Sequence, residues 1–345
     1  MMTFEFDAGL LPASNDITRL FESTFAELAT PGNRWTGSEK VAIAVATREA
    51  MQTRDQPTSG PGETANRVVG RLVNEPASAT KEWVEESVRS IGMDGYVELV
   101  GWAAMIVAID TYTKLRGSSP EQLPQPKPGA VSEVGHIKNL RMRGAWVPMV
   151  GPHTPRETLS AVPRTQQAMT ALLDRLYNRH RIESRRGIAP LTATQVELVA
   201  TVTSHGNRCF YCTLGHLTML LKAAEAEHFE IEPMGIVDPE IRTHVPSGET
   251  LVALSRKGLS FANGADVIKE VVEQVGAEGA ACAVEVTSAF MMVNRLIEMT
   301  GQPTRKWEAE RIGSIVTELG LSEFPHAGHR ERIGLVTRAK RRLHV

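Results

Sequence analysis

Cysteine is scarce in this 345-residue sequence, with only Cys209, Cys212 and Cys282. Three thiols are too few for the disulfide framework of a small secreted domain. They also exclude an iron–sulfur cluster held by cysteine alone, which needs four thiolates. Cys209 and Cys212 form a Cys-x-x-Cys pair, which in a cytosolic chain indicates redox chemistry or metal binding. Cys282 lies in an apolar segment and is expected to be an inert buried thiol.

An excess of one charge sign is also missing. Lys plus Arg number 38 and Asp plus Glu number 40, which gives a formal charge of −2. This balance does not predict nucleic acid or an anionic membrane as a main partner. The N-terminus shows no basic region followed by an apolar one, and the apolar run at residues 99–109 is shorter than the roughly 20 residues that cross a bilayer. We therefore expect a soluble cytoplasmic protein.

Patterns typical of β-strands are rare, whereas apolar residues recur at helical spacing along most of the chain. The sequence therefore predicts an all-α fold. The expected helices cover residues 21–28, 39–51, 63–74, 80–91, 95–115, 163–177, 194–204, 209–226, 265–275, 279–299 and 306–319.

The length predicts about two domains. The clearest boundary is the segment 118–164, which holds eight of the 19 prolines and cannot continue a helix. Its apolar part, residues 144–150, is expected to dock on a domain. We expect an N-terminal helical domain (1–117), a proline-rich linker (118–160), a second helical domain (161–320) and a basic C-terminal tail (321–345).

The two halves resemble a distant repeat. Thr36 and Glu39 precede an apolar helix in the first half, as Thr192 and Gln195 do in the second. Both patterns predict a capping box, in which a Thr and a Glu or Gln three residues later bond to each other's backbone N–H. A Gly-x5-Glu pattern before an apolar helix also recurs, at residues 92–98 and 279–285.

The residues that carry chemistry lie between 192 and 224. Glu197 falls in one predicted helix, and Cys209, Cys212 and His216 fall in the next, after a break at Gly206-Asn207. A cysteine in the first turn of a helix experiences the positive end of the helix dipole, which favours the thiolate. Arg208 adds positive charge beside the pair. A thiol, an imidazole and a carboxylate together can form a proton relay.

This pattern, Glu-x11-Cys-x2-Cys-x3-His, resembles the signature of the alkylhydroperoxidase D-like group of the carboxymuconolactone decarboxylase superfamily. The surrounding segments are similar too: Val162-Pro163, LTATQVELVA from residue 191, and MMVNRL from residue 291 followed by TGQP. The resemblance covers most of residues 145–305, and the N-terminal half resembles the same fold more weakly. It implies two tandem all-α domains of this type, the first degenerate.

The resemblance also implies roles for the residues. Cys212 would be the peroxidatic thiol and Cys209 the resolving thiol, while His216 and Glu197 would form the relay. The protein would reduce a small-molecule hydroperoxide, without a metal or other cofactor. A dithiol or thioredoxin-like reductant would then restore the thiols, and the chain would assemble as a homo-oligomer. The well-known peroxidases of the group carry a histidine just before the second cysteine, where this chain has Tyr211.

The N-terminal copy lacks this chemistry. When Thr36 is matched to Thr192, the motif residues correspond to four positions of the first half. Glu197 and Cys209 fall on Val41 and Thr53, and Cys212 and His216 fall on Gln56 and Gly60. No thiol, imidazole or carboxylate stands at these positions. We therefore expect the first half to be a degenerate copy that packs against the active one.

Several alternatives remain open for the motif. Glu197 lies three residues after Thr194, so it is also a candidate for a helix cap, although Gln195 offers Thr192 an equal partner. His205, Cys209, Cys212 and His216 form a candidate zinc site, but the two histidines would be about 16 Å apart on one continuous helix. A lyase of the carboxymuconolactone decarboxylase kind, a redox-sensing protein without catalysis and a disulfide-exchange protein are further hypotheses.

Overall fold

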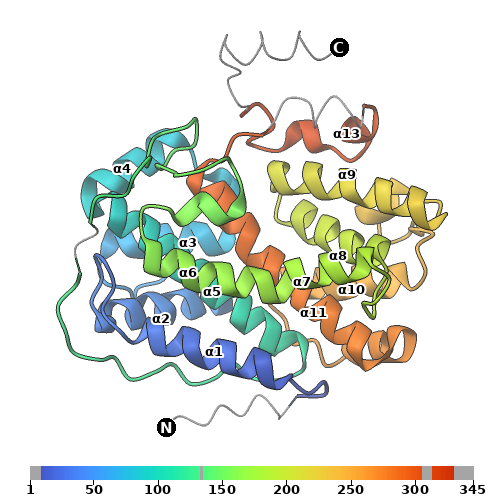
Figure 1. The fold of residues 1–345 in the computed structure, drawn as a ribbon, viewed down its shortest axis with the longest axis horizontal. Coiled ribbons are helices and arrows are strands. Elements are labelled where there is room, and N and C mark those ends of the chain that lie inside the picture. The colour runs from blue at the N-terminus through green and yellow to red at the C-terminus, as the bar shows by residue number, and fades with distance from the viewer. Residues whose placement is uncertain (1–8, 133–134, 305–312, 330–345) are drawn as a thin grey trace.

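The computed structural model of the protein describes residues 9–132, 135–304 and 313–329. The prediction of an all-α protein is confirmed, because the described residues form helices and their connections (Figure 1). The β pairing among them is limited to an isolated bridge between Arg141 and Met149.

The helices of the two halves follow the same plan. In each half, two consecutive helices pack against each other and against one long buried helix. In the N-terminal half these are α2 (Gly37–Thr53), α3 (Glu63–Asn74) and α5 (Met93–Leu115). In the C-terminal half they are α8 (Ala193–Gly206), α9 (Phe210–Glu227) and α11 (Ile268–Thr300). The remaining helices, including the single turn α13, are α1 (Asn15–Leu28), α4 (Lys81–Ile91), α6 (Pro163–Leu173), α7 (Arg179–Arg185), α10 (Gly248–Leu259) and α13 (Ile315–Glu318).

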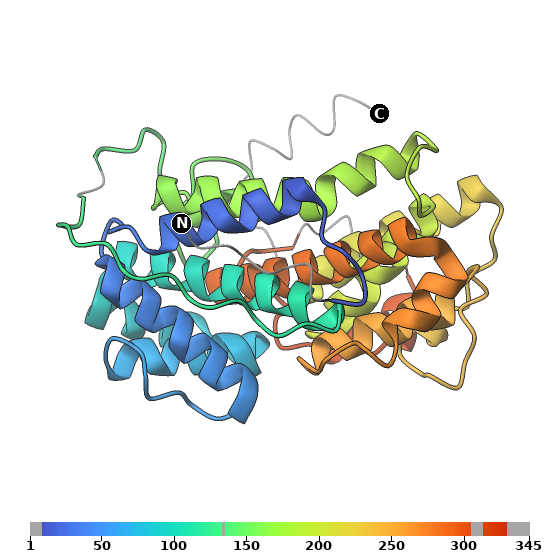
Figure 2. The same ribbon diagram turned by 90° about the horizontal axis from the view of Figure 1, so that it is seen from below.

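The long helices α5 and α11 pack against each other and join the two halves (Figure 2). α5 is buried along almost its whole length, and α11 is buried from Gly279 onward. One hydrophobic cluster runs through both of them and includes Val97, Leu99 and Met105 of α5 and Val286, Phe290 and Met299 of α11. The core is therefore continuous across the helix interface. The domain limits that the sequence suggests stay a prediction.

Both predicted capping boxes are confirmed. Thr36 accepts from the N–H of Glu39, whose carboxylate accepts from the Thr36 N–H at 2.8 Å. Thr192 and Gln195 form the same reciprocal pair at the start of α8. The repeat in sequence therefore corresponds to a repeat in how α2 and α8 begin.

Most predicted helices are present, and the structure adds two that the sequence did not predict, α7 and α10. α10 was not predicted, because glycine residues at both of its ends obscure its short apolar pattern. Gly276, with φ of 74°, interrupts α11 and separates the two helices that the sequence predicts at 265–275 and 279–299. The predicted helix at 306–319 lies partly outside the described residues, as does most of the basic C-terminal tail.

The linker crosses the surface of the helices (Figure 1), and the regular structure in its described residues is limited to the Arg141–Met149 bridge and a 3-10 turn at Pro155–Leu159. The N–H of Lys127 donates to the carbonyl of Ala29, and that of Trp146 to the carbonyl of Thr300. The prediction that its apolar part docks is confirmed, since Trp146, Val147 and Met149 are buried. Gly301 makes this possible: a Cβ there would lie 2.0 Å from the Trp146 ring.

One described helix, α11, is long and apolar enough by composition to cross a membrane. The bent pair α4–α5 passes the same test only when it is taken as one broken span. In the structure, 94% of the apolar 18-residue stretch of α11 that meets this test is buried by the rest of the protein. A buried core helix also meets these criteria, so the finding is weak evidence for a membrane span.

Candidate active site

The α8–α9 hairpin positions the two cysteines at the start of a helix, as the sequence predicts. The connection turns at Arg208, which adopts a left-handed conformation with φ of 55°. Cys209 is the N-cap residue of α9, and Cys212 lies in its first turn. Both are free thiols. The Arg208 side chain, expected beside the thiols, instead donates to the carbonyl of Glu323 at 3.2 Å.

His216 and Glu197 are brought together, as expected for a relay. The Nδ1 atom of His216 donates to Glu197 Oε2 at 2.8 Å. Glu197 is buried on α8, and because Gln195 completes the capping box, its carboxylate is not used as a helix cap. His216 lies one turn after Cys212 on the same face of α9. With Nδ1 held by the carboxylate, Nε2 is the nitrogen that remains to exchange a proton.

Tyr177 is a third member of this network that sequence reasoning missed. Its hydroxyl donates to Glu197 Oε1 at 3.1 Å and lies 3.3 Å from His216 Nδ1. Burial, followed by the charge of Glu197, raises the pKa of Tyr177 well above its usual value, so the phenol stays protonated. Tyr177 lies in a π-helical turn, Asp174–Asn178, at the end of α6. Such turns are frequent at functional sites, but they leave no simple sequence pattern.

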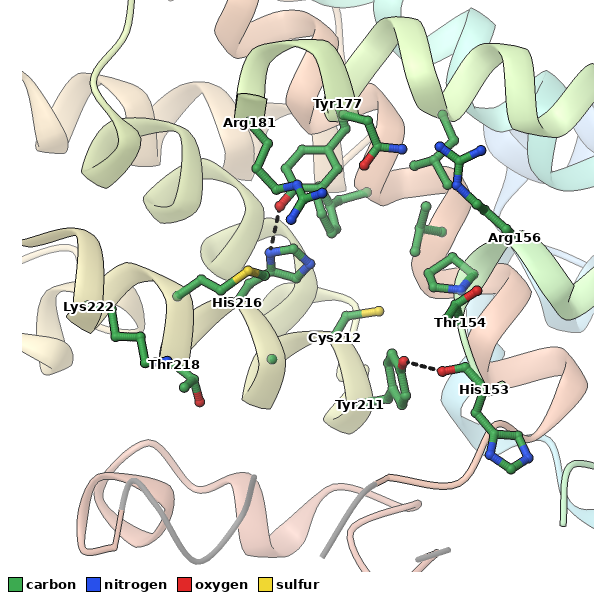
Figure 3. A pocket seen from close by; sticks show the side chains of 17 residues that line it. His153, Thr154, Arg156, Tyr177, Arg181, Tyr211, Cys212, His216, Thr218 and Lys222 are labelled. Carbon is green, nitrogen blue, oxygen red and sulfur yellow. Dashed lines mark hydrogen bonds between the residues drawn. The ribbon is translucent and has the colours of Figure 1, made fainter. Parts of the chain in front are cut away.

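A pocket of about 480 Å³ opens beside these residues (Figure 3). Cys212, His216 and Tyr177 line it, whereas Cys209 is fully buried and does not. Tyr211 also lines the pocket, and its hydroxyl donates to the His153 carbonyl at 2.8 Å. The apolar part of the wall comes from Pro155, Leu173, Met219, Phe290 and Val293.

The charged residues on the pocket wall are all basic. They are Arg156, Arg181 and Lys222, and no carboxylate is among the lining residues. Arg156 forms an ion pair with Asp174, which is outside the lining. Arg181 makes no ion pair within the described part of the chain, and its guanidinium carbon lies 5.9 Å from the centre of the Tyr177 ring. The pocket therefore combines an apolar wall with positive charge.

Cys209 has a different environment on the opposite side of the pair. Burial raises its pKa well above the usual value, and hydrogen bonding and charge from Cys212 and Glu298 raise it further. Glu298 is buried near the end of α11 and forms an ion pair with Nδ1 of His326. Sequence reasoning missed both residues, because they lie 86 or more positions after Cys212 and carry no motif spacing.

His205 and Cys282 lie apart from this site. His205 donates from Nε2 to the Leu319 carbonyl at 3.0 Å and packs on Phe324. In the residues that the structure describes, no group of three or more His, Cys, Asp or Glu side chains is placed to hold a metal ion. The arrangement therefore does not support the zinc alternative. Cys282 is buried in α11, as expected, and burial raises its pKa.

The N-terminal positions that correspond to the motif carry none of this chemistry. Val41 lies on α2, and Thr53 is its last residue. Gln56 and Gly60 lie in the loop before α3. The structure therefore has one thiol site, in its C-terminal half. Comparisons with known protein families, curated proteins and solved structures found no match to this chain.

Proposed function

We propose that this protein is a thiol-dependent peroxidase of the alkylhydroperoxidase D-like kind, which reduces organic hydroperoxides to alcohols. The observation that carries the proposal is the position of Cys212. It opens onto the pocket beside His216, which Glu197 and Tyr177 hold from behind. Cys209 lies next to it but away from the pocket, as suits a thiol that reacts only in a second step.

In the first step, Nε2 of His216 accepts the proton of Cys212. The thiolate attacks the terminal oxygen of the hydroperoxide, the O–O bond breaks, and Cys212 becomes a sulfenic acid. The leaving alkoxide takes the proton from His216 and departs as the alcohol. Glu197 keeps His216 in the tautomer that exposes Nε2, and Tyr177 fixes the carboxylate.

In the second step, the Cys209 thiol attacks the sulfur of the Cys212 sulfenic acid. A disulfide forms and water leaves. An external dithiol then reduces the disulfide by thiol–disulfide exchange, which returns both cysteines to thiols and oxidises the dithiol. Each cycle thus consumes one hydroperoxide and one dithiol and yields one alcohol, one water and one disulfide.

The proposal is tested by mixing the prereduced protein with hydrogen peroxide or an organic hydroperoxide and counting thiols over time. We expect the native chain to lose two thiols rapidly. Cys212→Ser should lose none at that rate, and Cys209→Ser should stop at a sulfenic acid that a dimedone probe traps. Cys282→Ser is the matched control and should behave like the native chain.

Two outcomes would overturn the proposal. If native thiols disappear only at the rate of free cysteine, the protein is not a peroxidase, and exchange with a protein disulfide becomes the reaction to assay. If Cys212→Ser still oxidises rapidly at Cys209, the attacking thiol has been assigned wrongly.

A further inference from the structure

A second pocket, of about 310 Å³, lies between the two halves of the chain. The C-terminal ends of α2 and α3 form one side of it, and the α8–α9 connection and α11 form the other. No residue lines both this pocket and the pocket of Cys212. The peroxidase chemistry proposed above therefore gives this second pocket no role.

Positive charge dominates the wall of the second pocket. Arg54, Arg208 and Arg295 line it, and Glu75 is the carboxylate among the described lining residues. Glu75 is exposed and lies 4.0 Å from Arg71, which is outside the wall. Within residues 9–132, 135–304 and 313–329, the three arginines form no ion pair, and their hydrogen bonds go to uncharged acceptors. Three arginines against one glutamate leave this arginine pocket with two net positive charges.

Shared contacts show that the three arginines converge. The guanidinium carbons of Arg54 and Arg295 lie 4.5 and 5.3 Å from the centre of the same ring, that of Phe261. Nη1 of Arg295 also donates to Oδ1 of Asn207 at 3.2 Å, and Asn207 directly precedes Arg208. Residues from both halves of the chain thus bring positive charge to one place.

Arg295 is a buried cation without a counter-charge among the described residues, and it is 2% exposed. Its guanidinium donates to the carbonyls of Met291 at 2.8 Å and Val73 at 3.0 Å, but no described residue accepts a hydrogen bond from its Nε. Burial, followed by the charge of Arg54, lowers the pKa of Arg295 to about 9. Burying an unpaired charge costs free energy, and a nearby anion offsets that cost.

Arg54 and Arg208 are exposed and keep donors that a ligand can use. Arg54 donates from Nη2 to the Leu259 carbonyl at 3.3 Å, and Arg208 donates from Nη2 to the Glu323 carbonyl at 3.2 Å. A guanidinium has five N–H donors, so these bonds leave most of them available. The two side chains can therefore contact an anion in the pocket while Arg295 attracts it from the buried side.

We propose that the arginine pocket binds the phosphate group of a small molecule. Arg54 and Arg208 donate to the phosphate oxygens, and the charge of Arg295 stabilises the bound anion. The planar guanidinium forms paired hydrogen bonds with phosphate oxygens, which makes arginine a common phosphate ligand. The phosphate group is that of inorganic phosphate or of a phosphate monoester. This site does not depend on the peroxidase function.

Charge and size favour a small phosphorylated ligand. A phosphate monoester carries about −1.5 to −2 charges at pH 7, which balances the two net positive charges of the wall. A single carboxylate would leave one of these charges uncompensated. The volume of about 310 Å³ is near the lower end of the roughly 300–1,000 Å³ of small-molecule sites, so it suits a small compound.

The test is calorimetric titration of the native chain, in phosphate-free buffer at constant ionic strength, with inorganic phosphate and with glycerol 1-phosphate. We expect saturable binding of at least one of them. Arg54→Gln and Arg208→Gln should each raise Kd about 10- to 100-fold, as expected when a charge-assisted hydrogen bond is lost. Arg34→Gln is the matched control, because Arg34 is also exposed and lies 5.7 Å from the centre of an aromatic ring, that of Trp35, but does not line the pocket. It should bind like the native chain.

A second measurement tests the buried charge of Arg295. A ligand that binds the folded state raises the unfolding temperature. We expect phosphate to raise Tm of the native chain, and to raise Tm of Arg295→Met by less, each compared with the same protein without phosphate. This difference remains readable even when Arg295→Met is less stable than the native chain.

The outcomes divide clearly. Glycerol 1-phosphate binding at least tenfold more tightly than inorganic phosphate would support a phosphate monoester, and the reverse order would support the free ion. Absence of saturable binding for both would overturn the proposal. Acetate binding as tightly as phosphate, or an equal loss in Arg34→Gln and Arg54→Gln, would also overturn it, because the attraction would then be unspecific.

Discussion

The two halves of the molecule share the same helical frame. α2 and α8 both begin with a capping box. Both are followed by an arginine in the left-handed conformation, Arg54 at φ 64° and Arg208 at φ 55°. Each half then packs its helix pair on a long helix, α5 or α11. The frames differ chiefly in what their buried ionisable groups contact.

In the N-terminal half, buried charges are matched to structural partners. Glu98 accepts from the N–H groups of Asn33, Arg34 and Trp35, which fixes the loop before α2. Lys40 donates to the carbonyls of Glu27 and Thr30. In the C-terminal half, Glu197 and Glu298 instead face imidazoles, those of His216 and His326. The two halves therefore differ in whether a buried carboxylate accepts hydrogen bonds from fixed backbone N–H groups or faces a side chain that can itself gain or lose a proton.

The largest expected difference between the halves concerns the rate at which a hydroperoxide oxidises Cys212. We expect Glu197→Gln to lower the second-order rate of Cys212 oxidation by about 10² to 10⁴-fold, because the relay loses the charge that orients and stabilises His216. Glu98→Gln removes an equally buried carboxylate and should leave this rate within about twofold. Stopped-flow mixing with an organic hydroperoxide measures both. Equal losses in the two variants would erase the distinction between the halves.

The next largest effect concerns the free energy of unfolding and depends on a buried residue of the N-terminal half. Burial lowers the pKa of Lys40 to about 8, below its value in an unfolded chain. Between pH 8 and about 10.4 the unfolded state then binds more protons, so this residue makes stability rise with pH. We expect a gain of about 3 kcal/mol across this window, at 1.36 kcal/mol per pKa unit. Urea unfolding should show this rise in the native chain and lose it in Lys40→Met.

A smaller effect tests what the basic pocket recognises. Arg181 lines the pocket without an ion pair among the described residues, so it is free to bind an acidic group of a substrate. We expect Arg181→Gln to raise KM about tenfold for a hydroperoxide that carries a carboxylate, which corresponds to about 1.4 kcal/mol. KM for a neutral hydroperoxide such as cumene hydroperoxide should not change. An equal rise for both substrates would indicate a damaged pocket instead of lost recognition.

The smallest effect concerns Tyr177. Tyr177→Phe removes one hydrogen bond to Glu197 but keeps the ring against Phe290. We expect a decrease of about fivefold in the oxidation rate, as for a hydrogen bond worth about 1 kcal/mol. Thermal unfolding should change little, and it serves as the control for packing. A loss as large as that of Glu197→Gln would instead make Tyr177 a member of the relay in its own right.

Sequence patterns predicted the parts of the fold and of the site that depend on local spacing. Helix periodicity located α3 and α5, and the capping boxes identified the starts of α2 and α8. The thiol, imidazole and carboxylate of Cys212, His216 and Glu197 could be predicted because two of them share a helix face and the third lies on the adjacent helix. All three are within 20 residues of one another.

The missed residues depend on contacts between distant segments. Tyr177 reaches Glu197 through a π-helical turn, a change in helix register that the apolar pattern of α6 does not record. Glu298 and His326 meet only after α11 and the segment beyond α13 have packed together. A glutamate in an apolar helix is visible in the sequence, but the partner it will face is decided by tertiary packing.

The pairing of α5 with α11 has a consequence for how the chain is made. During synthesis, α5 is complete about 150 residues before α11 begins, as their limits at Leu115 and Ile268 show. At roughly 5–20 residues per second, the nascent chain waits about 8–30 s before its partner helix begins. Throughout this interval, the side of α5 that α11 will cover stays uncovered on the ribosome. Chaperone capture of the growing chain should therefore be strongest before α11 emerges and should end once it has docked.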